Sequence, residues 1–222
     1  MNIRISPSLA KGSVTAPPSK SMAHRALICA ALAKGESRIA GISDCEDVSA
    51  TLDCLSALGA ECRFDNDTVV IQGVDFSKSV GALIPCRESG STMRFMLPLC
   101  LLSGNSHTLT GAPSLLRRPM TVYQDLCHNH GLYFSHDANG IIVKGPLTAG
   151  EYTLPGDVSS QFISGMLFAL TQVKGAAQQV VQGNMPGFIS YGLNTLATAG
   201  TMAVGILIIT TILRFWHRFH QN

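Results

Sequence analysis

Charged residues are scarce in this sequence, and they are unevenly distributed. Asp, Glu, Lys and Arg make up 14% of the 222 residues, and the net charge is +2. No basic run and no alternation of basic with aromatic residues occurs, so we expect no nucleic-acid partner. The last acidic residue is Asp157, and no charged residue lies between Lys174 and Arg214. The composition therefore changes near residue 172, and residues 1–172 and 173–222 are interpreted separately.

Several motifs that define common protein classes are missing as well. P-loop and dinucleotide fingerprints do not occur. The histidines lack the spacing of metal ligands, and we expect His107, His128 and His136 to lie at the surface. The seven cysteines form no C-x-x-C pair and several lie in apolar runs, which is typical of buried reduced thiols in a cytoplasmic protein. Residues 1–21 lack the apolar segment of a signal peptide.

The sequence does contain an internal repeat of roughly 70 residues, with the order helix, strand, helix, strand, strand. Corresponding glycines lie 69 residues apart in Gly35 and Gly104, and 72 apart in Gly59 and Gly131. Apolar spacing and boundary residues predict the elements. The predicted helices cover residues 21–33, 47–58, 91–102, 119–128 and 160–170, and the predicted strands cover residues 37–42, 61–64, 69–72, 107–110, 132–134, 141–144 and 152–154.

Two and a half copies of this repeat are present. We expect an α/β fold of βαβαββ-type repeats around a pseudo-threefold axis, with helices inside and strands outside. The third copy has only a strand and a helix in this pattern, so we expect it to be incomplete and to lack its completing strand.

Each copy opens its first helix with hydroxyl or glycine residues, in Pro17–Ser21, Glu88–Thr92 and Gly156–Gln161. Helix N-termini expose unpaired N–H groups, and serine there caps the helix and can donate to an anion. If the copies are symmetric, these openings face one end of the molecule. They would then form a pocket for phosphate or carboxylate groups with Lys20, Arg25, Arg94 and Arg118 nearby. The alternative is that each serine is only a cap and each arginine is only solvated.

Four segments in order resemble the EPSP synthase family (3-phosphoshikimate 1-carboxyvinyltransferase). They are the N-terminal motif Ala16-Pro-Pro-Ser-Lys-Ser21 with His24-Arg-Ala-Leu27, the second motif Glu88-Ser-Gly-Ser-Thr-Met-Arg-Phe95, the segment Leu115-Leu-Arg-Arg-Pro-Met120 and the segment Gly156-Asp-Val-Ser-Ser-Gln-Phe162. The resemblance covers residues 1–170. The related UDP-N-acetylglucosamine enolpyruvyl transferases have Lys followed by Asn, so the Lys20-Ser21 pair favours the shikimate branch.

The resemblance implies an inside-out α/β barrel of the enolpyruvyl transferase type. It also implies transfer of the enolpyruvyl group of phosphoenolpyruvate to the 5-hydroxyl of shikimate 3-phosphate, in aromatic amino acid biosynthesis, without a metal or organic cofactor. Shikimate 3-phosphate ligands would be Lys20, Ser21, Arg25, Ser159, Ser160 and Gln161. Phosphoenolpyruvate ligands would be Lys20, Gly90, Arg118 and Gln161. Arg94 belongs to the second motif and supports this assignment.

Family members are about twice this length, and their second lobe supplies an Asp and a Glu for acid–base work. No acidic residue follows Asp157 here. We therefore assign no catalytic residue, and we expect weak binding of shikimate 3-phosphate and a turnover near zero. The alternatives are a non-catalytic truncated remnant that binds anions weakly and a membrane-tethered interaction protein.

Residues 173–222 form an apolar tail without family motifs. Residues 196–213 are uncharged, and Arg214, Trp216 and Arg218 follow them. This pattern fits a membrane segment of marginal length, a buried helix, or a tail that replaced the natural continuation through an altered reading frame or a gene fusion. The abrupt loss of acidic residues favours the last interpretation.

Overall fold

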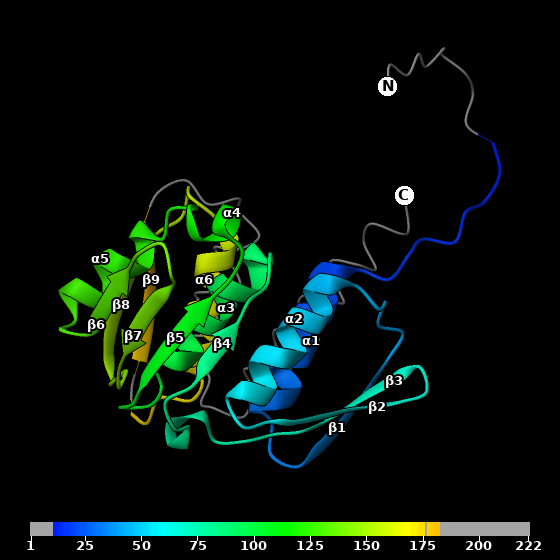
Figure 1. Ribbon diagram of the computed structural model, residues 1–222, viewed down its shortest axis with the longest axis horizontal. Coiled ribbons are helices and arrows are strands. Elements are labelled where there is room, and N and C mark those ends of the chain that lie inside the picture. The colour runs from blue at the N-terminus through cyan, green and yellow to red at the C-terminus, as the bar shows by residue number, and fades with distance from the viewer. Residues whose placement is uncertain (1–10, 176, 183–222) are drawn as a thin grey trace.

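The computed structural model describes residues 11–175 and 177–182, which form three successive units (Figure 1). The first unit comprises α1 (Lys20–Leu32), β1 (Glu36–Ala40), α2 (Glu46–Ala57), β2 (Glu61–Asp65) and β3 (Thr68–Gln72). The 3-10 turn η1 (Phe76–Lys78) leads to the second unit, which comprises β4 (Leu83–Pro85), α3 (Gly90–Cys100), β5 (Ser106–Thr110), α4 (Pro113–Leu116), α5 (Thr121–Asn129), β6 (Tyr133–His136) and β7 (Ile141–Lys144). The third unit comprises β8 (Gly150–Pro155), α6 (Ser160–Leu170) and β9 (Ala177–Gln182).

Each unit has its own sheet. The first sheet has the strand order β1-β3-β2 and is antiparallel throughout. The second has the order β4-β5-β7-β6, in which β4 and β5 are parallel and the other pairs antiparallel. In the third, β8 and β9 are parallel. The crossover β8-α6-β9 thus repeats the crossover β4-α3-β5, so the second and third units share this part of their topology.

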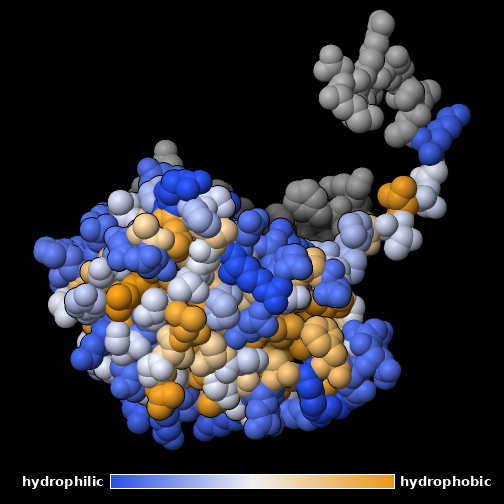
Figure 2. Space-filling view, viewed as in Figure 1, coloured by the Kyte–Doolittle hydropathy of each residue, from blue (hydrophilic) through white to orange (hydrophobic). Residues whose placement is uncertain are grey.

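The helices pack against one another between the sheets and form one hydrophobic core. Helix α3 packs on α6 and on α2, and α2 packs on α1. The ring of Phe95 lies at this junction, edge-on to Phe168 of α6 with 5.8 Å between the ring centroids. On α2, the buried residues Val48, Leu52 and Leu55 recur at helical spacing, which explains why this segment folds as a helix against the core. On the face drawn in Figure 2, hydrophobic residues are interspersed with hydrophilic ones.

The predicted arrangement of repeated α/β units is confirmed, and the described strands form separate sheets without closing a barrel. One correction concerns the helix predicted over residues 119–128. It begins only at Thr121, because Met120 is a cap residue with the nonhelical dihedral angles φ −122° and ψ 26°. A short helix, α4, precedes it.

A second correction concerns the end of the third unit. The strand expected to be missing after residue 170 is present as β9, which pairs along its whole length with β8. The uncharged composition of this segment did not suggest a strand. It forms one because it pairs in parallel with β8 after the α6 crossover. β9 ends at Gln182, the last residue that the structure describes.

A third correction concerns His107, which is fully buried and not at the surface. The hydroxyl oxygens of Ser103 and Ser79 lie 2.9 Å and 3.2 Å from its Nε2 atom. These contacts satisfy Nε2 inside the protein, whereas the buried Nδ1 atom has no partner within the described residues.

Residues 196–213, for which a membrane segment was one interpretation, lie outside the described residues. Within residues 11–175 and 177–182, none of the helices has both the length and the apolar character needed to cross a bilayer.

Candidate anion-binding site

Three serines cap the helices that open the units. Ser19, Ser89 and Ser159 precede α1, α3 and α6, so that successive caps are 70 residues apart. Each serine has extended backbone, and its side-chain oxygen accepts a hydrogen bond from a backbone N–H group of the first turn at 3.3 Å. The repeat inferred from the sequence is therefore reproduced at each helix start. Each start presents backbone N–H groups and the positive end of the helix dipole.

Side chains join the starts of α3 and α6. Arg94 Nη1 donates to Gln161 Oε1 at 2.6 Å, and Gln161 Nε2 donates to Ser91 Oγ at 2.7 Å. The Arg94 guanidinium also stacks over the ring of Phe162, with 5.0 Å to the centroid. Burial, followed by the neighbouring charge of Arg118, lowers the pKa of Arg94. A cationic group is therefore held between two units, next to a second cation.

Arg118 lies against the bare backbone of Gly90. A Cβ atom placed on Gly90 would lie 2.4 Å from Arg118 Nη1 and 3.6 Å from Arg94 Nη1. A side chain at this position would displace the end of Arg118, so glycine permits this close approach at the first residue of α3. Two guanidinium groups beside free N–H groups of a helix start form an environment that favours a phosphate or carboxylate.

Arg25 joins α1 to α6. Its Nη1 donates to the Ser21 carbonyl at 2.9 Å and to Ser21 Oγ at 2.7 Å, and its Nη2 donates to Ser164 Oγ at 3.4 Å. The guanidinium also lies over Phe95, with 5.2 Å to the ring centroid. Burial lowers the pKa of Arg25. The predicted residues Ser21 and Arg25 are thus in direct contact, and Arg25 reaches the helix that carries Ser160 and Gln161.

Lys20 has a partner that the sequence analysis did not single out. Its Nζ donates to Asp47 Oδ2 at 2.5 Å, and this hydrogen bond, followed by the charge of Asp47, raises the pKa of Lys20. The Lys20 side chain remains 55% exposed and can reach a ligand. Asp47 lies 27 residues after Lys20 in the sequence. The two side chains meet only because α1 packs on α2.

The predicted residues fall into two connected groups. Direct contacts link Gly90, Arg94, Arg118 and Gln161 in one group, and Ser21 with Arg25 in the other. Ser160 is exposed as the first residue of α6 and makes no side-chain hydrogen bond within the described residues. The described part of the chain contains no cluster of His, Cys, Asp or Glu that could hold a metal ion. The fold and these contacts together define a repeat-built α/β protein in which arginine side chains gather at the starts of helices from different units.

Comparison with known proteins gives the family. The family model described as EPSP synthase (3-phosphoshikimate 1-carboxyvinyltransferase) matches residues 6–189, and the chain belongs to this family. The matched range extends beyond residue 170, where the sequence motifs end, and includes β9.

Named relatives and solved structures agree with this result. A 3-phosphoshikimate 1-carboxyvinyltransferase from Clostridium perfringens (strain SM101) is 37% identical over 201 residues, which are 88% of this chain and 47% of that protein. One from Clostridium acetobutylicum is 39% identical over 179 residues, which are 78% of this chain and 42% of that protein. An EPSP synthase structure from Acinetobacter baumannii has a TM-score of 0.65 at 24% identity, covering 79% of this chain and 41% of that one, and it supports the fold. This chain spans just under half the length of these proteins.

Proposed function

We propose that this chain binds shikimate 3-phosphate and phosphoenolpyruvate as the anion-binding part of an enolpyruvyl transferase of the shikimate pathway, located in the cytoplasm. The proposal rests on the residues at the start of α3. Arg118 and Arg94 lie close to the backbone of Gly90, and Gln161 of the third unit accepts a hydrogen bond from Arg94. Phosphoenolpyruvate carries a phosphate and a carboxylate, and the two guanidinium groups offer planar donors to each.

The second group suits the other substrate. Ser21 and Arg25 present hydroxyl and guanidinium donors at the start of α1, and Ser159, Ser160 and Gln161 do so at the start of α6. These donors would hold the 3-phosphate and the ring hydroxyls of shikimate 3-phosphate. Lys20 lies at the start of α1 with its ammonium exposed, and it would contact both substrates.

Transfer of the enolpyruvyl group also needs acid–base chemistry, because the enol carbon must gain a proton and the attacking hydroxyl must lose one. Asp47 is held in an ion pair with Lys20, and it does not offer a free carboxylate for this work. We therefore propose that the chain by itself binds substrate weakly and does not turn it over.

Calorimetry on the full chain tests this function, with Arg118→Gln compared against Arg117→Gln. Both residues are exposed and adjacent, but only Arg118 contacts the Gly90 region. We expect Arg118→Gln to weaken phosphoenolpyruvate binding by roughly tenfold, as for the loss of one charge-assisted contact. We expect Arg117→Gln to have no effect and wild-type turnover to be near zero. Equal affinities of the two variants, or measurable turnover by the chain alone, would contradict the proposal.

A further inference from the structure

Asp47 connects the starts of two helices that carry the proposed site. It lies in the first turn of α2, where its carboxylate accepts from Lys20 Nζ of α1 at 2.5 Å. Burial by itself would raise the pKa of Asp47, but hydrogen bonds from Lys20 and from the Ser89 hydroxyl, with the Lys20 charge, outweigh burial and keep that pKa below its usual value. Ser89 is the cap of α3. The Asp47 carboxylate therefore contacts Lys20 of α1, and the Asp47 carbonyl oxygen lies 3.4 Å from Thr92 Oγ1 in the first turn of α3.

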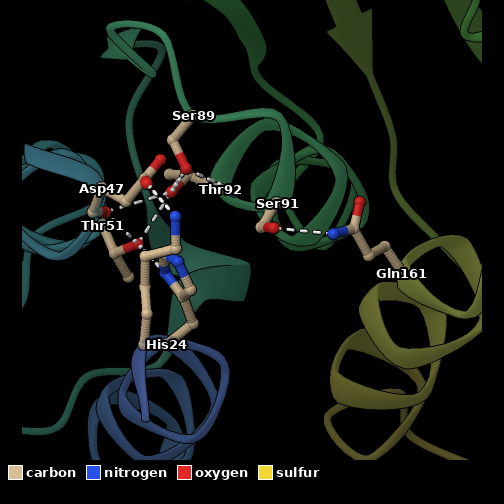
Figure 3. A network of polar contacts seen from close by, with 8 residues as sticks. His24, Asp47, Thr51, Ser89, Ser91, Thr92 and Gln161 are labelled. Carbon is tan, nitrogen blue, oxygen red and sulfur yellow. Dashed lines mark hydrogen bonds and ion pairs between the residues drawn. The ribbon is translucent and has the colours of Figure 1, made fainter. Parts of the chain in front are cut away.

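Behind Asp47, buried hydroxyl groups of α2 and α3 and the His24 ring of α1 lie within hydrogen-bonding distance of one another (Figure 3). Thr92 Oγ1 lies 2.8 Å from Ser89 Oγ, and Thr51 Oγ1 lies 2.8 Å from Thr92 Oγ1. His24 Nδ1 lies 2.7 Å from Thr51 Oγ1.

The same hydroxyl groups also contact the backbone at the start of α2. Thr51 Oγ1 donates to the Asp47 carbonyl oxygen at 3.1 Å, and Thr92 Oγ1 lies 3.4 Å from the same oxygen. The Nε2 atom of His24 is buried and has no partner within the described residues. Through its side chain and its carbonyl oxygen, Asp47 is therefore in contact with α1 and α3 as well as with its own helix.

We infer that Asp47 is a positioning residue, which holds the Lys20 ammonium beside the start of α3 and acts on ligand affinity through Lys20. The inference rests on the proposed function, because it concerns the affinity of the same site. A free lysine side chain samples many rotamers, and immobilising one on binding has a cost that an existing ion pair reduces. The opposite effect, repulsion of the anionic ligand by the carboxylate, is weakened because the Lys20 ammonium already pairs with that charge at 2.5 Å.

A double-mutant cycle separates these effects. The isosteric Asp47→Asn change should weaken binding of shikimate 3-phosphate by about three- to tenfold, the cost of ordering one long side chain. In a Lys20→Met background, the same change should have no further effect, because its route to the ligand is gone. The exposed Asp125→Asn change on α5 removes the same charge away from the site and should leave affinity unchanged. Equal losses in both backgrounds would mean a merely structural role, and tighter binding would mean repulsion; either result overturns the inference.

A second readout needs no ligand. Because Asp47 raises the pKa of Lys20, Asp47→Asn should increase the rate at which an amine-acylating reagent modifies Lys20 near pH 8, measured by peptide mass spectrometry. An unchanged rate would overturn the control of Lys20 by Asp47. Absence of shikimate 3-phosphate binding by the wild-type chain would instead overturn the proposed function, and the acylation rates would still decide the relation between Asp47 and Lys20.

Discussion

Two buried histidines make stability depend on pH. His24 and His107 are 1% and 0% exposed, and burial lowers the pKa of both below the ordinary value of 6.5. The unfolded chain therefore takes up protons near pH 6.5 at positions where the folded chain does not. The stabilising effect of the neutral rings is complete above pH 6.5, and it is lost as the pH falls from there towards the lowered values.

We expect the unfolding free energy, measured by urea denaturation, to be lower at pH 5.5 than at pH 7.5. His24→Gln should reduce that difference, since one of the two buried titrating groups is removed. The exposed His128 provides the control, and His128→Gln should keep the wild-type difference. A pH difference that is the same in His24→Gln as in the wild type would contradict the assignment to His24.

At the scale of helices, the contact between α3 and α6 depends on Gly165. A Cβ atom at this position would lie 2.5 Å from the Arg94 carbonyl oxygen and 2.6 Å from the Tyr123 hydroxyl oxygen. That hydroxyl oxygen lies 2.9 Å from the carbonyl oxygens of both Arg94 and Phe162, which share its single hydrogen, so it has little freedom to move away. The added methyl group must therefore push the two helices apart.

Gly165→Ala should lower the unfolding free energy by about 1–3 kcal/mol, in the range of an overpacked core. Gly104→Ala is the matched control, since its Cβ would meet only Pro146 Cδ at 3.9 Å, and it should change stability by less than about 0.5 kcal/mol. Urea titrations of the two variants compare the effects directly. Equal stability of the two variants would show that the helices have room to separate.

Much of the element pattern could be predicted from the sequence, because caps and periodic apolar residues are local signals. The predicted start of the helix at residue 160 is confirmed, and those of α1 and α3 differ by one residue. The strand β4 and the helix α4 were missed because three and four residues are too short to show a period. The basic residues of the site were predicted from motifs, whereas Asp47 was not, because its role depends on two helices meeting in space.

For the whole molecule, Phe95 is the residue at which the three units meet. It lies edge-on to His24 of α1, with 6.2 Å between ring centroids, and to Phe168 of α6, and the Arg25 guanidinium lies over its ring. The core formed by these helices is continuous through all three units. We therefore expect the described units to unfold together.

Phe95→Ala should lower the unfolding free energy by about 3–5 kcal/mol, as expected for a fully buried aromatic ring. The unfolding transition should remain single. Far-UV circular dichroism and hydrogen exchange should therefore report the same midpoint. Phe64→Ala on the exposed face of β2 is the control and should have little effect. Two separated transitions in Phe95→Ala would show that the units fold independently.

The strand ladders of the described chain never pass from one unit to the next. Neighbouring units are therefore joined by side chains at the helices, and these joints are softer than a continuous sheet. A doubly charged ligand that contacts the N-termini of α1, α3 and α6 would link the three units. Its binding should reduce the motion of the units relative to one another, including residues that do not contact the ligand.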